Sequence, residues 1–286
     1  MDRLDNIGEN EIRIIGSAPE KEPKPKKRSP WTFFFIIAAV VVLGALAWFF
    51  FRGAKEPAGK SDAAPTDSTE EKRAYVEISD TMINNVSLHR FIPLHARPSL
   101  VMGVMKEFPS DCILGAMAAD FGLNKGEYQV IGAFVHQGKM LSYSRSKYGF
   151  CALLSDTVVM GNELTTSYFE RAIKEGGDFF RQYALVHNGQ VVSNPPTHND
   201  ALRRALCRMK DGRLGIIDTD MSVSLDSFST AISQYGVVAA VALMGSGAAV
   251  RWAVDKQGRR FIAGADEYDF PDVVNYIVWR KEDTAQ

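Results

Sequence analysis

The most constraining feature of this chain is a tight turn that recurs four times, each time between two apolar runs. Every copy contains polar residues and a glycine, which readily adopts the positive φ that short hairpin turns require. Asn-Gly and Asp-Gly pairs are the strongest short-range signals for a β-hairpin. The turns lie at residues 136–139, 187–190, 210–213 and 255–258. Four hairpins predict a largely antiparallel or mixed sheet.

Three short helices are predicted among these hairpins. One spans residues 168–175 behind a cap at Thr166 or Ser167, and a second lies within residues 224–236. Serine and threonine cap helix N-termini, and the glycines that follow both segments end helices. A third helix is predicted over residues 110–121. Because strands and helices are intermixed, the predicted fold class is α+β.

An apolar run at residues 31–51 divides the chain. As a helix it would be about 31 Å long at ~1.5 Å per residue, which is enough to cross a bilayer core of ~30 Å. A cleaved signal peptide is the alternative, but its apolar core would be about 7–15 residues long and would follow a short basic start. The run is therefore interpreted as an uncleaved signal anchor, a single transmembrane helix that precedes the domain.

Basic residues are concentrated on the N-terminal side of this run. Lys24, Lys26, Lys27 and Arg28 precede it, against Arg52 and Lys55 after it. Because the more basic flank stays cytoplasmic, the N-terminus is expected in the cytoplasm. The C-terminal domain is then expected to be periplasmic or extracellular, as part of a single-pass protein of the cell envelope.

The remaining sequence is assigned to three segments. Residues 1–30 mix charges with prolines and are predicted to form a disordered cytoplasmic tail. Residues 52–73 are rich in small, charged and proline residues and are predicted to form a flexible linker. Residues 74–286 are numerous enough for one buried core and are predicted to form a single domain.

Composition excludes several functional classes. A net charge of −1 argues against a nucleic-acid-binding protein. Three cysteines exclude a disulfide-dense scaffold, and either one disulfide with a free thiol or three buried thiols fits Cys112, Cys151 and Cys207. The five histidines lack metal-ligand spacing, and His136 and His187 are interpreted as turn residues. No metal and no cofactor are predicted.

Two carboxylates, Asp218 and Asp220, follow the apolar run at residues 214–217. Carboxylates at the end of a strand can ligate a cation or take part in acid–base chemistry. A solvated turn is the simpler alternative, and both interpretations stay open from sequence.

The order of motifs across residues 116–279 resembles that of the phosphodiester glycosidase domain family. In order, the family carries an Asn-Gly-Lys-Val-Val hairpin, an Arg-Thr-Ala-Ile-Gly strand, a Lys-Asp-Gly-Lys-Leu turn, a capped helix and a Leu-Asp-Gly-Gly-Gly-Ser-Ser signature. The corresponding segments here are residues 187–192, 203–207, 210–214, 224–236 and 242–249. The resemblance implies the family fold and an ancestry among hydrolases that cleave sugar-1-phosphodiester bonds.

Several polar residues of the family signature are missing. The replacements are Met244 for the aspartate and Ala248 and Ala249 for the two serines. The family also carries an earlier Asn-Gly-Gly-Phe-Phe-like motif, which corresponds to residues 116–122 and has Ala118 in place of its asparagine. The residues that carry the remaining resemblance to a site are Arg203, Gly245, Gly247 and, beside the lost asparagine, Asp120.

These departures leave two functions open. Glycoside cleavage uses positioned carboxylates, and methionine supplies neither charge nor hydrogen bonding. The favoured hypothesis is a catalytically degenerate module that binds an envelope glycan, a sugar phosphate or a partner protein. The alternative is a divergent hydrolase in which Arg203 binds phosphate and Asp120, Asp218 or Asp220 supplies the acid–base chemistry.

Overall fold

The computed structural model describes residues 73–282, except for residues 106, 165, 194–198 and 265–268. The predicted tail (1–30) and apolar run (31–51) lie outside the described residues, as does the predicted linker (52–73) except for its last residue. Among the described residues, no helix is both long and apolar enough to cross a membrane. The elements below belong to the unit formed by Ser68–Gln286.

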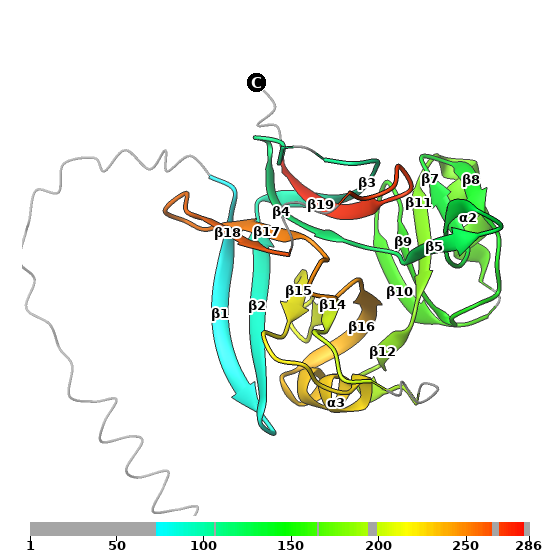
Figure 1. The fold of residues 1–286 in the computed structure, drawn as a ribbon. Helices are drawn as coiled ribbons and strands as arrows, with labels where there is room; N and C mark the ends of the chain where they lie inside the picture. The colour runs from blue at the N-terminus through cyan, green and yellow to red at the C-terminus, as the bar shows by residue number, and fades with distance from the viewer. Residues whose placement is uncertain (1–72, 106, 165, 194–198, 265–268, 283–286) are drawn as a thin grey trace, which may run out of the picture. The chain divides into compact units, whose positions relative to one another are not determined.

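The described chain is built from β-strands, so the predicted α+β fold class is wrong. Nineteen strands and two α-helices, α2 and α3, make up its regular structure (Figure 1). Every pairing between named strands is antiparallel. The fold of the described residues is therefore all-β, with two helices packed on the sheets.

The two sheets that carry the helices contain twelve of these strands. The seven-stranded sheet runs in the order β1 (Tyr75–Ile83), β2 (Val86–Leu94), β15 (Leu214–Asp218), β14 (Arg204–Met209), β16 (Val237–Leu243), β12 (Ala184–His187) and β13 (Gln190–Val191). A five-stranded sheet runs in the order β10 (Val158–Asn162), β9 (Gly149–Leu153), β11 (Asp178–Gln182), β7 (Phe134–His136) and β8 (Lys139–Ser142).

The other seven strands form a second five-stranded sheet and a separate hairpin. The sheet runs in the order β18 (Arg260–Ala263), β17 (Arg251–Val254), β4 (Cys112–Met117), β19 (Asn275–Lys281) and β3 (Ala96–Met102). The hairpin consists of β5 (Phe121–Asn124) and β6 (Glu127–Val130).

All four predicted hairpins are confirmed. Residues 136–139 join β7 to β8, residues 187–190 join β12 to β13, residues 210–213 join β14 to β15, and residues 255–258 join β17 to β18. The glycines at these turns all have positive φ: Gly138, Gly189, Gly212 and Gly258. The turn chemistry is local, which is why sequence alone located it.

Two of the three predicted helices are also confirmed. Helix α2 (Ser167–Glu175) begins after Thr166, whose side chain accepts a hydrogen bond from the Tyr168 N–H, and it ends at Gly176. Helix α3 (Leu225–Gln234) begins after Ser224, whose hydroxyl accepts from the Ser227 N–H at 3.0 Å. Helix α2 packs on β9 and β11, and α3 packs on β12 and β16 (Figure 1).

The helix predicted over residues 110–121 is wrong, because this segment forms β4 and the start of β5. All six residues of β4 are buried, since the strand lies between β17 and β19. A short apolar run that is buried on both faces has no alternation, so periodicity cannot distinguish it from a helix. At Gly115 an added Cβ would lie 2.2 Å from the Trp252 ring, so glycine is required where the strands pack.

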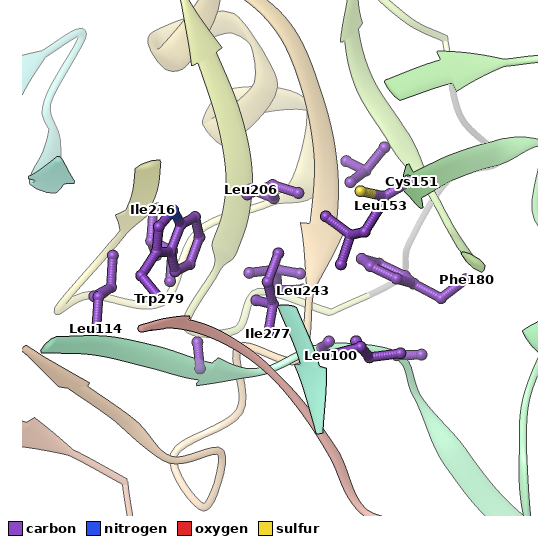
Figure 2. Packing of buried hydrophobic residues seen from close by; sticks show 14 of the residues in the cluster. Leu100, Leu114, Cys151, Leu153, Phe180, Leu206, Ile216, Leu243, Ile277 and Trp279 are labelled. Carbon is purple, nitrogen blue, oxygen red and sulfur yellow. The ribbon is translucent and has the colours of Figure 1, made fainter. Parts of the chain in front are cut away.

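One core joins the three large sheets. Leu206 and Leu243 enter it from the seven-stranded sheet, Phe180 from the β11 sheet, and Leu114 and Ile277 from the β19 sheet (Figure 2). Burial of such side chains supplies about 1.5–3 kcal/mol each. The ends of strands from different sheets are thereby brought together.

The three cysteines are free and buried. Burial raises the pKa of Cys112 to about 11 and raises the pKa of Cys151 and of Cys207 further. Thiols in such surroundings are inert, so of the two interpretations open from sequence the structure supports three buried thiols.

Candidate functional site

Arg203 precedes β14 and Arg204 is its first residue, and the two side chains have different hydrogen-bond partners. Arg203 donates from Nε to the Val223 carbonyl at 2.9 Å and from Nη2 to the Asn199 carbonyl at 2.7 Å. It makes no ion pair with a carboxylate of the described residues. Burial lowers the pKa of Arg203 and the charge of Asp200 opposes that shift, and arginine stays charged at neutral pH. Its guanidinium is therefore a positive charge that loop carbonyls hold in place.

A cavity of about 220 Å³ lies beside this side chain, and we call it the Arg203 cavity. Three of the predicted site residues line it: Asp120, Arg203 and Gly245. The wall also includes Gln182 at the end of β11, Tyr183, Leu243 at the end of β16, and Met244. Strand ends from two sheets and the loop before β5 thus meet around one space.

Lys147 binds two residues of the cavity wall, Asp120 and Gln182. Its Nζ pairs with Asp120 Oδ2 and donates to Gln182 Oε1 at 2.9 Å, and it lies 5.4 Å from the centre of the Tyr183 ring. The Lys147 side chain is buried, and its backbone has a φ of 65°. Left-handed backbone is unusual for lysine and concentrates at functional positions. Asp120 is therefore a fixed, charge-compensated carboxylate.

Asp218 is placed away from the Arg203 cavity, in a buried ion cluster. Its Oδ2 accepts from Arg204 Nε at 3.3 Å and from Arg251 Nε at 3.0 Å. The Arg251 guanidinium also lies 4.0 Å from the centre of the Phe91 ring. Burial lowers the pKa of Arg204 to about 10, and Asp218 opposes that shift. A carboxylate held between two arginines is not free for acid–base chemistry in the cavity.

The other donors of Arg204 position the glycine-rich loop after β16. Nη1 lies within hydrogen-bond distance of the carbonyls of Met244 (3.1 Å), Ala249 (3.1 Å) and Val250 (3.2 Å). The loop is thus held by a buried arginine rather than by polar side chains of its own.

The two signature glycines differ in their surroundings. A Cβ at Gly245 would lie 2.7 Å from the Leu202 carbonyl oxygen and 2.8 Å from the Arg204 nitrogen. At Gly247 no atom would lie within 4 Å of an added Cβ. Gly245 therefore lets the loop approach β14 closely, whereas Gly247 has no such steric role.

Asp220 lies on the surface and contacts His89, which also contacts Asp80. His89 Nε2 lies 3.2 Å from Asp220 Oδ2, and His89 Nδ1 lies 2.7 Å from Asp80 Oδ1. Burial of His89 opposes protonation, but the hydrogen bonds to Asp80 and Asp220 outweigh it and raise the pKa of His89. Among the described residues, no cluster of three or more potential ligands is arranged to hold a metal ion.

A buried asparagine supports the segment where the family asparagine is lost. Asn275 Oδ1 accepts from the Ala119 N–H at 2.8 Å, and its Nδ2 donates to the Ala119 carbonyl at 3.1 Å. The neighbouring Ala118 carbonyl accepts from the Met244 N–H at 3.1 Å. The segments around Ala118 and Met244 therefore lie against each other beside the Arg203 cavity and are joined by a backbone hydrogen bond.

Comparison with known proteins identifies the fold. No known protein family and no curated protein matches the chain. Among solved structures, the catalytic domain of zebrafish N-acetylglucosamine-1-phosphodiester alpha-N-acetylglucosaminidase, auto-inhibited by its pro-peptide, is 13% identical, with 79% of this chain and 87% of that chain covered and a TM-score of 0.53. A hypothetical protein from Synechocystis is 11% identical, with 72% and 62% covered and a TM-score of 0.54.

The likeness shows a phosphodiester glycosidase-like fold, in agreement with the resemblance seen in the motif order. At such identities it shows the fold alone, so the chemistry must come from the residues of this chain. Sequence reasoning found Asp120, Arg203 and Gly245 but missed Lys147 and Asn275. Asn275 ends a segment, residues 270–275, that resembles the closing strand of the family, but nothing local marked its side chain as a partner of Ala119. Lys147 belongs to no motif, and both residues act across long sequence separations.

We predict that the two signature glycines respond differently to alanine. Gly245→Ala is expected to lower the free energy of unfolding by about 1–3 kcal/mol, because the new Cβ would overlap the backbone of β14. Gly247→Ala is the matched control and is expected to stay within about 0.5 kcal/mol of the wild type. Urea unfolding of both variants measures the difference. Equal stabilities would contradict the close approach of loop and strand.

We also predict a pH-dependent contribution of His89 to stability. Because its folded-state pKa is raised above 6.5, its stabilisation is fully present below that pH and is lost as the pH rises through the folded value. The loss of stability in His89→Gln, measured by urea unfolding, is therefore expected to be larger at about pH 5.5 than at about pH 8.5. His187→Gln, whose histidine has no carboxylate partner among the described residues, is the control. A difference that grows with pH would show the opposite linkage.

Proposed function

We propose that the Arg203 cavity binds a sugar phosphate without cleaving it. One observation carries the proposal: Asp120, the one carboxylate in the wall of this cavity among the described residues, is paired with Lys147, whereas Arg203 has no such partner. The guanidinium of Arg203 therefore has no direct ion-pair partner among the described residues, and the charge of Asp200 reaches it only as a longer-range attraction. A guanidinium binds phosphate oxygens through paired, charge-assisted hydrogen bonds.

The rest of the wall argues for binding rather than hydrolysis. Glycosidases place two carboxyl groups about 5–9.5 Å apart across the scissile bond. The wall of this cavity holds no second carboxylate among the described residues, since Leu243, Met244 and Gly245 carry no acid. Asp218 is buried and paired with Arg204 and Arg251, and Asp220 contacts His89. Neither therefore supplies the second carboxyl group.

The sugar part of the ligand has suitable contacts as well. Tyr183 and Leu225 offer apolar surface, and Gln182 and Ser246 offer hydrogen-bonding groups, in the same wall as Arg203. A small, largely apolar cavity with a few polar groups is typical of a small-molecule site. The zebrafish enzyme, by its name, acts on an N-acetylglucosamine 1-phosphodiester, which makes N-acetylglucosamine 1-phosphate the first probe to use.

We predict that Arg203→Met weakens binding of N-acetylglucosamine 1-phosphate about tenfold or more, because a charge-assisted hydrogen bond is lost. Isothermal titration calorimetry with the full chain measures the affinity. Arg97→Met removes an arginine that is 78% exposed and lies outside the cavity, so it should bind like the wild type. Undetectable binding to the wild type, or equal loss in both variants, would exclude the proposed site.

A divergent hydrolase is the alternative, and Asp120 is the observation in its favour. Its side chain is 38% exposed and lines the cavity, so it could exchange a proton with a leaving group. The same full chain is expected to release no sugar from an N-acetylglucosamine 1-phosphodiester. Release that disappears in Asp120→Asn would establish the hydrolase instead.

We further propose that the C-terminal domain lies outside the cytoplasm and meets its ligand in the cell envelope. The proposal rests on the apolar run (31–51) and on the basic residues before it, which lie outside the described residues. Protease added to intact spheroplasts is expected to digest residues 74–286, while a cytoplasmic marker protein stays whole. Full protection of the domain until the cells are lysed would place it in the cytoplasm.

A further inference from the structure

A second cavity, of about 150 Å³, lies at the N-terminal end of α2. We call it the Arg181 cavity. Its wall combines aromatic rings with polar and charged groups, and it includes Tyr143, Ser144, Arg145, Phe169, Glu170 and Arg181. No residue of this wall lines the Arg203 cavity. The two cavities therefore offer separate sets of contacts.

Arg181 gives this cavity a buried positive charge. The residue is 4% exposed, and its hydrogen bonds run to backbone carbonyls: Tyr148 at 3.1 Å, Glu163 at 2.9 Å and Leu164 at 2.6 Å. No carboxylate of the described residues pairs with it. Carbonyl dipoles fix the guanidinium but leave its net charge uncompensated. Such a charge favours an anion in the adjoining space.

Two further features add to the positive potential. Arg145 is an exposed cation in the same wall. The first turn of α2, a helix of nine residues, also faces the cavity through Thr166, Phe169 and Glu170. The N–H groups at a helix N-terminus favour negative ligands. Glu170 is the one carboxylate among the described residues of the wall, so cations still outnumber anions there.

An aromatic ring is exposed beside these charges. Tyr143 is 63% exposed, and its ring packs against that of Phe169 with the centres 5.6 Å apart. A tyrosine held by a neighbour presents a rigid flat surface on which the apolar face of a sugar ring can stack. Ser144 and Glu170 can exchange hydrogen bonds with sugar hydroxyls. The aromatic surface and the hydroxyl partners thus lie next to the anion-attracting groups.

We propose that the Arg181 cavity binds an acidic monosaccharide unit, with its ring on Tyr143 and its carboxylate facing Arg145 and Arg181. A neutral sugar would use the aromatic surface but leave the charge uncompensated. An inorganic anion would meet the charge but not the ring. The aromatic surface and the positive charge together favour a ligand that carries both a sugar ring and a negative charge.

The site lies next to the Arg203 cavity without sharing its ligand contacts. Arg181 and Gln182 are neighbours in β11, and successive side chains of a strand point to opposite faces. Arg181 lines one cavity and Gln182 lines the other. Residues 143–147 contribute to both cavities. Tyr143 and Arg145 line the Arg181 cavity, and Lys147 pairs with Asp120 of the Arg203 cavity. The proposal does not rest on sugar-phosphate binding by the Arg203 cavity.

The test measures the binding of D-glucuronate to the full chain by isothermal titration calorimetry. We expect D-glucuronate to bind at least about tenfold more tightly than D-glucose or acetate, because each of these lacks one half of the recognised chemistry. Tyr143→Ala and Arg145→Gln are each expected to weaken glucuronate binding about tenfold. Both positions are exposed, so neither change removes core packing.

Matched controls assign the effect to this cavity. Tyr128→Ala removes a tyrosine that is 51% exposed, and Arg97→Gln removes an exposed arginine, each outside the wall. Both are expected to bind glucuronate like the wild type, as is Arg203→Met. Absence of glucuronate binding, equal binding of glucose, or insensitivity to Tyr143→Ala and Arg145→Gln would overturn the proposal. Loss of glucuronate binding in Arg203→Met alone would assign the acidic sugar to the Arg203 cavity instead.

Discussion

The arrangement around the Arg203 cavity depends on the ion pairs that the buried carboxylate of Asp218 makes with two arginines. An ionised carboxylate inside a protein is costly unless it is paired and hydrogen-bonded. Arg204 supplies one partner from the neighbouring strand β14, and Arg251 supplies the other from β17 of a different sheet. The two sheets must therefore meet so that both guanidiniums reach one oxygen. Removal of one member of such a cluster leaves buried charge without compensation, which typically costs about 3–5 kcal/mol.

Hydrogen bonds from arginine side chains to backbone carbonyls occur at both cavities. Arg181, Arg203 and Arg204 all donate to backbone carbonyls of loops, which fixes irregular backbone that strands cannot hold. Five N–H donors on a planar group suit arginine to this task. Of the three, Arg204 alone is paired with a carboxylate among the described residues. Loop positioning and an uncompensated charge at a cavity therefore come from the same side chains.

Several parts of the fold and of the site could be predicted from particular residues. Glycines in the four hairpin turns and the capping residues Thr166 and Ser224 act within a few residues, so their signals are readable in sequence. Arg203 and Gly245 were found because they belong to motifs. Lys147 and Arg181 were not, because neither residue belongs to a motif and the partners of both are distant in sequence. The same limit explains β4, whose buried apolar run becomes a strand through its neighbours β17 and β19.

The sequence by itself determined where four of the hairpins turn and where α2 and α3 begin. The tertiary structure decided the fold class and the environment of each carboxylate. Asp218 and Asp220 are two residues apart, yet one is buried between arginines and the other contacts a surface histidine, because β15 ends at Asp218. Turn and cap preferences are properties of adjacent residues. Burial, ion pairing and the choice between strand and helix for an apolar run depend on contacts that form only when distant segments pack.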